Sequence, residues 1–355
     1  METNNDKTLE KEFAKNEKKV AKAMAKKEKK LEREIRHNER KVKFYKWHNK
    51  NYKLEDNQFR YNLVNWKTDG MIFLSCAFFI PVLFSLIGFF FFDLKTNNYT
   101  QATVELAKLI SAAVGLFLLG QRHSRILWSG GFAWYFLYVL APQFIVLILA
   151  FIPFENSDIF NMLAMLISGA AVLIIILKFD RVITKRMKET FKNHLGTLIV
   201  TSLIAFVAMF LISTMFFSSL IENTWLNLAQ AENQNSLTGP LNDANTSTTV
   251  KIIYVIILFA YAVVVAPLLE EIVIRQSWFV NIGNKWAGLI FSSLFFGFMH
   301  YGTTGDYEHF LSYTSAGFCL GAVFIFSKAN VTYSWMVHLL NNLTAFILMI
   351  IGAFA

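Results

Sequence analysis

The sequence predicts an all-α protein: a polytopic transmembrane helical bundle of about eight or nine spans, preceded by a long basic N-terminal helical arm. First, the chain has 355 residues of which 55% are hydrophobic, including 36 Phe, which is too apolar for an ordinary soluble domain. Second, the apolar residues are gathered in runs of about 20, the length that crosses a membrane. Third, residues 1–70 hold 20 Lys and Arg against 12 Asp and Glu, whereas the rest of the chain holds 14 against 13.

Residues 1–69 are predicted to form a charged helical arm in the cytosol. The first residues contain no apolar segment of the kind found in signal peptides, and no Gly or Pro interrupts the arm. Four repeats of eleven residues begin at positions 4, 15, 26 and 37. Eleven residues close three helical turns almost without drift, so equivalent places form a straight stripe. The third place is acidic (Asp6, Glu17, Glu28, Glu39), the sixth is aliphatic (Leu9, Val20, Leu31, Val42), and the tenth is apolar until the last copy (Phe13, Met24, Ile35, Lys46).

Three interpretations of this stripe remain open. The arm forms a right-handed or antiparallel pairing with another helix, it lies on an anionic membrane surface, or it is a solvated charged helix without a partner. Its lysines, and the aromatic residues that cluster near the first span, favour attachment to membrane lipids. These aromatic residues are Phe44, Tyr45, Trp47, Tyr52, Phe59 and Tyr61. The interleaved glutamates argue against binding to nucleic acid.

Nine apolar segments are predicted to span the membrane. They are residues 71–92, 101–120, 131–154, 159–177, 196–221, 250–280, 286–304, 310–327 and 331–354. Pro81 predicts a kink in the first. Glu105 and Lys108 lie three residues apart in the second, where they can pair or extend toward the interface. Residues 70–249 then form a region of N-terminal spans, and residues 250–355 form a catalytic core.

The charges of the loops predict a topology. The basic loops 121–125 and 178–196 are expected in the cytosol, whereas loops 154–158 and 222–249, which have no Lys or Arg, are expected outside. The protein is therefore predicted to be a multi-pass protein of the cell membrane with a cytosolic N-terminus. Segment 250–280 is long enough to be tilted, or broken near Pro267.

Three charged residues lie within six positions of an apolar segment: Glu270, Glu271 and Arg275. A charge at membrane depth costs about 2.5–3.5 kcal/mol on insertion scales, so such residues usually face a wet cavity or a partner. Glu271 and Arg275 are four residues apart and are predicted to pair. Glu270 points about 100° away on a helix and is left to act as a general base. The alternative is a buried ion-pair cluster that only locks the packing of helices.

Two further segments carry candidate partners. His300 ends an apolar run one turn after Phe296, where a single histidine is more often packed than functional. His338 and Asn342 are four residues apart on one helical face and can donate hydrogen bonds toward one point, as stabilisation of an oxyanion requires. A polar clamp between helices is the alternative for this pair. His309 is assigned no role, and the two cysteines, Cys76 and Cys319, are interpreted as packing residues.

The order of these motifs resembles a known family. Glu-Glu-x-x-x-Arg stands at Glu270–Arg275, Phe-x-x-x-His at Phe296–His300 and His-x-x-x-Asn at His338–Asn342. This order is similar to that of the CAAX protease and bacteriocin-processing (CPBP, or Abi) family of intramembrane proteases. The resemblance covers roughly residues 250–345 and includes neither the arm nor the first five spans.

The resemblance implies roles for these residues. Glu270 with His300 would activate the attacking water, and His338 with Asn342 would stabilise the oxyanion. Glu271, Arg275 and Phe296 would shape the site. The family has been described both as zinc metalloproteases and as glutamate-dependent enzymes. Glu270, His300 and His338 could form a three-ligand zinc site, with Glu271 as the base. The sequence has no HExxH and no Cys ligand set, which favours the glutamate mechanism.

The leading functional hypothesis is therefore an intramembrane CAAX-type endopeptidase that acts on a peptide or a membrane-protein substrate. Bacterial relatives are associated with bacteriocin self-immunity, peptide maturation and signalling, and eukaryotic relatives trim prenylated proteins. One alternative is a non-catalytic membrane scaffold with the same fold, and another is a transporter or proton relay. Complete motifs argue against the scaffold, and the absence of a repeat among the spans argues against the transporter.

Overall fold

The computed structural model describes residues 3–55, 59–127, 131–149, 157–243, 246–302 and 304–354, and these are helical or in connections, without strands. The chain divides into two compact units, Met1–Lys53 and Leu54–Ala355. The all-α prediction is confirmed.

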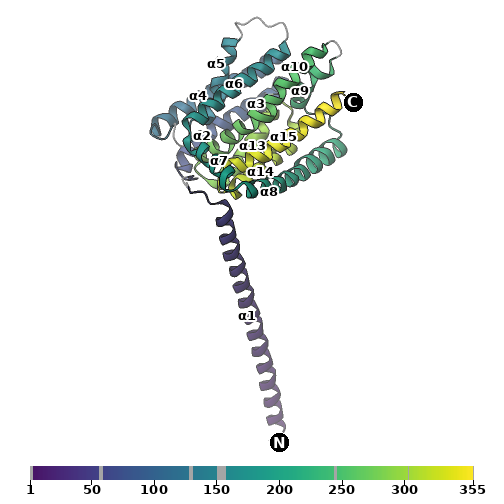
Figure 1. The fold of residues 1–355 in the computed structure, drawn as a ribbon. Helices are drawn as coiled ribbons and strands as arrows, with labels where there is room; N and C mark the ends of the chain where they lie inside the picture. Colours follow the sequence, from purple (N-terminus) through teal and green to yellow (C-terminus); the bar gives the residue numbers. More distant parts are fainter. Residues whose placement is uncertain are drawn as a thin grey trace. The chain divides into compact units, whose positions relative to one another are not determined.

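The first unit is one helix, α1 (Thr3–Tyr52), of 50 residues and roughly 75 Å (Figure 1). Where side chains are described, the apolar stripe is open to solvent: Met24, Leu31, Ile35 and Val42 are between 50% and 69% exposed. The helix ends short of the predicted boundary at residue 69. It does so because the following aromatic residues pack within the second unit, for example Phe59 on Phe324 with ring centroids 5.5 Å apart.

Seven helices of the second unit are long and apolar enough to cross a membrane, among the described residues. They are built from α2 (Met71–Leu74) and α3 (Ile80–Phe91), α4 (Asn98–Arg122), α6 (Ser157–Phe179), α8 (Leu195–Met209), α10 (Thr248–Leu258) to α12 (Trp278–Ile282), α14 (Phe310–Phe326) and α15 (Val331–Phe354). π-helical turns extend several of them, as at Trp66–Gly70, Ser75–Phe79 and Phe210–Trp225.

The two other predicted spans correspond to shorter helices. These are α5 (Trp134–Leu149) and α13 (Lys285–Tyr301), of 16 and 17 residues. The predicted end of span 131–154 lies outside the described residues. Amphipathic α7 (Arg181–Asn193) forms most of the basic loop 178–196, and α9 (Glu232–Asn242) lies within the loop 222–249. The number of long helices agrees with a multi-pass membrane protein, whereas the sidedness of the loops stays a prediction.

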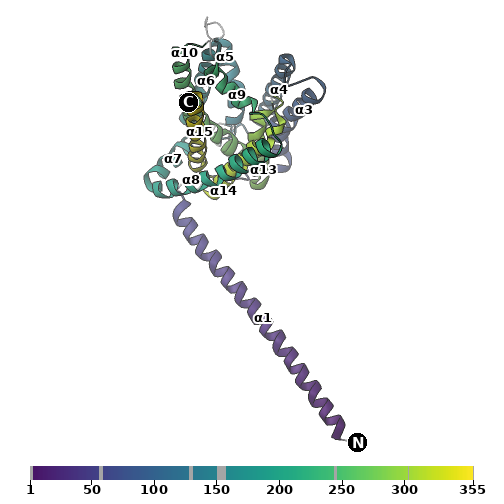
Figure 2. The same ribbon diagram turned by 90° about the vertical axis from the view of Figure 1, so that its right-hand side faces the viewer.

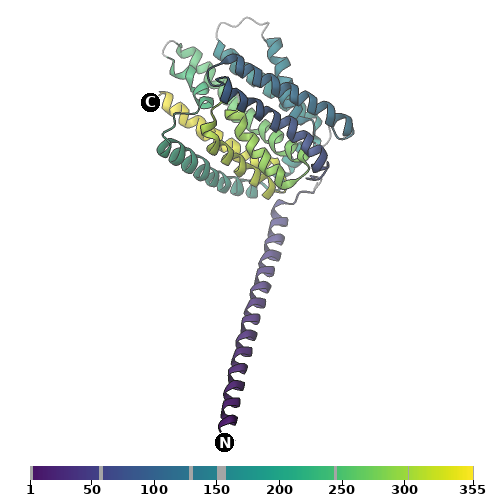
Figure 3. The ribbon, with the colours of Figure 1, turned by 180° about the vertical axis from the view of Figure 1, so that it is seen from behind.

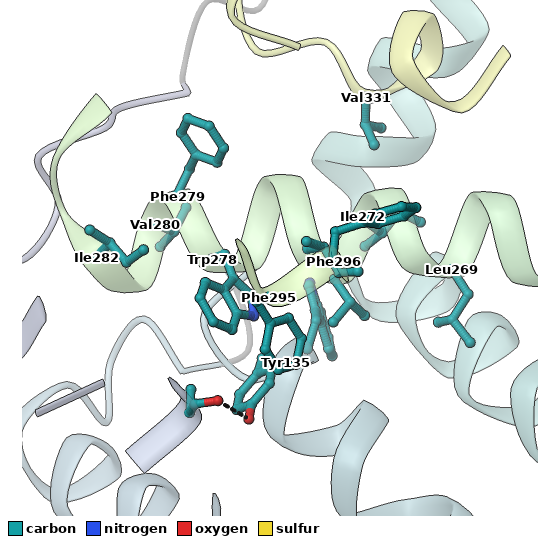
Figure 4. Close-up of a cluster of buried hydrophobic side chains, with 14 of the residues drawn as sticks. Tyr135, Leu269, Ile272, Trp278, Phe279, Val280, Ile282, Phe295, Phe296 and Val331 are labelled. Carbon is teal, nitrogen blue, oxygen red and sulfur yellow. Dashed lines mark hydrogen bonds between the residues drawn. The ribbon is translucent and has the colours of Figure 1, made fainter. Parts of the chain in front are cut away.

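An aromatic core joins the early spans to the C-terminal third of the chain. The rings of Trp278 and Phe295 stack with centroids 4.2 Å apart, and the Tyr135 hydroxyl donates a hydrogen bond to the Ala77 carbonyl over 3.3 Å (Figure 4). Phe73 meets Trp278 edge-on at 5.1 Å. Seen from behind, the blue helices of residues 71–91 run beside the green helices of the C-terminal third (Figure 3). Helix α12, which follows the Glu-Glu-x-x-x-Arg motif, and helix α13, which carries Phe296 and His300, are therefore held from several sides.

Helices α13 and α14 lie against each other through small residues (Figure 2). A Cβ atom placed on Gly297 would lie 2.5 Å from Thr314 Oγ1, and one placed on Gly317 would lie 2.8 Å from the Ser293 carbonyl oxygen. Small residues let transmembrane helices approach this closely. The contact holds the end of α13, with His300, next to α14.

The long helix of residues 248–282 passes through Pro267 without a break. A π-helical segment, Phe259–Val265, precedes α11 (Ala266–Glu270), and a second, Glu271–Ser277, follows it. The Ala266 N–H donates to the carbonyl of Tyr261, five residues earlier. The next bond of this kind would run from residue 267 to the Ala262 carbonyl, but Pro267 has no N–H to donate. Asn342 Nδ2 donates to the Ala262 carbonyl instead, over 2.9 Å. This side-chain bond from α15 compensates for the proline, so the helix continues.

Candidate active site

The predicted pair of Glu271 and Arg275 is confirmed. Arg275 Nε lies 3.2 Å from Glu271 Oε2, and neither side chain is exposed. The guanidinium Nη1 also lies 3.3 Å from Ser292 Oγ and 3.4 Å from its carbonyl oxygen on α13. Arg275 Cζ lies 5.3 Å from the Phe296 ring centroid, within the range of a cation–π contact. Arg275 thus ties the motif helix to α13 and orients Phe296.

His338 of α15 lies beside both glutamates. Its Nδ1 is 3.3 Å from Glu271 Oε1, and its Nε2 is 3.8 Å from Glu270 Oε2. Glu270 and His338 are buried, with 9% and 3% of their surface exposed. Two carboxylates and one guanidinium leave one negative charge uncompensated in a region where isolated charge is costly. His338 lies against both carboxyl groups, so the four side chains form one buried cluster.

His300 of α13 contacts Phe296, as His338 does. The Phe296 ring centroid is 5.1 Å from that of His300 and 5.5 Å from that of His338. The His300 ring stacks on Tyr313 of α14, with centroids 4.7 Å apart and planes 11° from parallel. Asn233 Nδ2 of α9 is 3.3 Å from His300 Nδ1. An amide nitrogen only donates, so Nδ1 accepts, and the proton of the neutral ring is on Nε2.

Asn342 occupies the next turn of α15 after His338. Its Nδ2 donates to the Ala262 carbonyl, and its Oδ1 lies 3.5 Å from Asn341 Nδ2. The structure therefore brings Glu270, Glu271 and His338 into one cluster. It places His300 and Asn342 around this cluster, each with its own anchoring partner.

A cavity of about 260 Å³ lies next to Leu269, the residue before Glu270. Its lining comes from α4, α5, α6, α13 and the long helix, and includes Tyr138 and Tyr261. Glu105 and Lys108 also line it, with Lys108 Nζ 2.7 Å from Glu105 Oε2. The pairing predicted for these two residues is thus confirmed. Their opposite charges lie together at the wall of a cavity whose other lining residues are mostly apolar.

The residues proposed as zinc ligands do not form a three-ligand set here. The described part of the chain contains no group of three or more His, Cys, Asp or Glu side chains arranged to hold a metal ion. Glu270 and His338 lie together, and each of the rings of His300 and His338 contacts Phe296. We therefore derive no step through a metal, and zinc dependence stays a prediction that chelation can test.

A second polar cluster was missed by the sequence analysis. His309 Nδ1 is 3.2 Å from Glu222 Oε2, and its Nε2 is 3.9 Å from Asp306 Oδ2, all three residues being buried. Asp306 also accepts a hydrogen bond from the Glu232 backbone N–H at the start of α9, over 3.0 Å. This cluster positions α9, whose Asn233 contacts His300. No motif marks Asn233, which lies in a polar connection.

Comparison with known proteins supports the motif assignment. Residues 252–344 match the family described as type II CAAX prenyl endopeptidase, Rce1-like, which is the CPBP family. All the residues of the three motifs lie inside these limits, and the resemblance predicted from them is confirmed. A protein of Mycoplasma capricolum subsp. capricolum, described as uncharacterized, is 29% identical over 299 residues, covering 80% of this chain and 87% of the relative. No solved structure matches this chain at a significant level.

Proposed function

We propose that this chain, which carries a CPBP-family segment at residues 252–344, is an intramembrane endopeptidase that uses Glu270 as its base. The observation that carries the proposal is the buried cluster of Glu270, Glu271, Arg275 and His338, which brings two carboxyl groups and an imidazole together inside an apolar bundle. The family is one of proteases. The proposed substrate is a peptide or a membrane-protein segment, and the proposed location is the cell membrane, with the N-terminal arm in the cytosol.

The first step is attack by water on the carbonyl carbon of the scissile peptide bond. Glu270, as a carboxylate, accepts a proton from the water while the oxygen forms the new C–O bond. His300 orients the same water through its Nε2–H, since its Nδ1 accepts from Asn233. The electron pair of the carbonyl moves to its oxygen and gives a tetrahedral oxyanion. When this intermediate collapses, the C–N bond breaks and Glu270 returns its proton to the leaving amine.

The donors for the oxyanion are proposed to come from α15. His338, whose Nδ1 lies 3.3 Å from Glu271 Oε1, would donate from its Nε2, which lies on the side of Glu270. Asn342 presents its amide one turn away. Removal of one such donor costs about 10²–10³ in kcat in enzymes where it has been measured. Glu271 and Arg275 keep His338 in place and do not contact the substrate in this scheme.

The test compares membranes from cells that carry the wild type, Glu270→Gln or Glu308→Gln. Glu270→Gln keeps size and hydrogen bonding but removes the base, whereas Glu308→Gln makes the same change in a half-exposed pair with Lys95, outside the cluster. We expect new protein termini in membranes that carry the wild type or Glu308→Gln. We expect these termini to be absent with Glu270→Gln, although this variant is present in the membranes in the same amount as the wild type. The same comparison in the presence of a zinc chelator tests whether cleavage depends on a metal ion. Cleavage by Glu270→Gln at the wild-type level would show that Glu270 is not the base. A cellular phenotype that this variant keeps, but that deletion of the whole protein removes, would favour the non-catalytic scaffold.

A further inference from the structure

The repeat of the arm defines a seam that is broader than the apolar stripe alone. With eleven residues in three turns, the places of the repeat point in eleven directions about 33° apart. The second, sixth, tenth and third places are neighbours in this order around the helix. The two apolar places thus lie in the centre, between the second and the third. Along the chain, the second, sixth and tenth places follow one another at steps of four, four and three residues, as in an eleven-residue coiled-coil repeat.

The two flanks of this seam have opposite hydrogen-bonding character. The third place is a carboxylate in every copy: Asp6, Glu17, Glu28 and Glu39. The second place carries a side chain that donates hydrogen bonds in every copy: Asn5, Asn16, Lys27 and Asn38. Among the described side chains, Lys27, Glu28, Asn38 and Glu39 are exposed, as are the apolar residues between them. The helix therefore has a solvated seam with an acidic edge and a donor edge.

The basic residues of the arm lie on the other side of the helix. The fourth, fifth and eighth places point more than about 110° from the centre of the seam. In the third repeat these places hold Lys29, Lys30 and Arg33, all exposed. A helix lying on an anionic membrane through its apolar stripe would press its acidic edge toward the lipid headgroups and turn these lysines away. This arrangement argues against the lipid interpretation of the stripe and favours a protein partner.

We propose that the partner is a second copy of the arm, and that the two copies form a parallel, in-register coiled coil through this seam. In a parallel pair, the acidic edge of each helix faces the donor edge of the other, so Glu39 faces Asn38 of the second copy and Glu28 faces Lys27. In an antiparallel pair, the acidic edges face each other and repel. Copies of a membrane protein inserted in one orientation also present their arms on the same side.

The composition of the seam explains why one register is selected. Polar residues at core positions of a coiled coil lower stability but fix register and the number of strands. The donor edge places such residues at intervals of eleven, from Asn5 to Asn38, along roughly 50 Å of helix. The tenth place of the fourth copy is Lys46, so the apolar seam ends at Val42.

The test is disulfide cross-linking of the full-length protein in its native membranes. Leu31→Cys and Val42→Cys each place a thiol in the seam, and Lys29→Cys and Arg40→Cys place one on the far face two residues earlier. The chain that keeps only Cys76 and Cys319 measures the background. In the parallel pair, each seam variant gives a dimer with itself, and the far-face variants do not. In an antiparallel pair, the same residue of the two copies can meet at only one point along the helix. Cross-linking at position 31 or at position 42, but not at both, would therefore overturn the parallel arrangement.

A charge variant gives a second readout that does not depend on thiols. Met24→Glu introduces a carboxylate in the seam, and Ala25→Glu introduces the same charge at the neighbouring residue, off the seam. Met24→Glu is expected to reduce the Leu31→Cys dimer at least tenfold, and Ala25→Glu to leave it unchanged. The proposal would be overturned if neither Leu31→Cys nor Val42→Cys gave a dimer. If these thiols were in addition protected from a soluble thiol reagent only in vesicles of anionic lipid, the arm would be bound to the membrane surface instead.

Discussion

Replacement of Arg275 by Met tests whether the buried pair is structural. The change removes the guanidinium from a site where neither Arg275 nor Glu271 has exposed surface, and keeps most of the apolar volume. Glu271 then loses its guanidinium partner, with the His338 ring still 3.3 Å away, and the Ser292 groups lose their contact. Loss of one partner of a buried ion pair costs about 3–5 kcal/mol. Against a total stability of about 5–15 kcal/mol, this is enough to lower the amount of folded protein.

The assay is thermal unfolding of the purified protein in detergent, followed by tryptophan fluorescence. We expect Arg275→Met to lower Tm by roughly 5–15 °C. The double variant Glu271→Gln, Arg275→Met removes both charges and is expected to recover at least half of this loss, because no carboxylate is left without its partner. A single variant with a Tm within about 1 °C of the wild type, or a double variant less stable than the single one, would refute the reasoning.

Three further predictions concern the surroundings of the site. Asn342→Leu leaves the Ala262 carbonyl without its donor and is expected to cost about 1–3 kcal/mol, measured as a lower Tm. Gly317→Val places methyl groups against the α13 backbone and is expected to cost about 1–3 kcal/mol or more, measured in the same way. Asn233→Leu removes the donor to His300 and is expected to lower kcat about 5–30-fold with Tm unchanged. An unchanged kcat in this last variant would contradict the role given to α9.

Much of the architecture could be predicted because it depends on local periodicity. The apolar runs, the arm and the pairs Glu271–Arg275 and Glu105–Lys108 all follow from spacing along one helix. The end of α1 at Tyr52 could not be predicted from the spacing of residues along the chain. It is decided by aromatic contacts to residues such as Phe324, far away in the sequence.

The arrangement within the site depends on how separate helices meet, which the sequence does not express. The sequence did not predict that His338 lies beside both glutamates, which it does because α15 packs against the motif helix at that level. Asn233 lies in a connection without a motif, so its contact with His300 could not be foreseen. The chemical types of the residues were thus predictable, and their neighbours were not.

The bond between Asn342 and the Ala262 carbonyl has a consequence for the energetics of the proposed reaction. An amide that donates one of its two hydrogens to a fixed backbone oxygen cannot rotate, so its other hydrogen points in a set direction. Charge that develops there meets a dipole already aligned, and little energy is lost in reorienting it. Pro267 creates the acceptor by lacking an N–H. A residue that would ordinarily end a helix thus serves here to reduce the reorganisation energy of a side chain on a different helix.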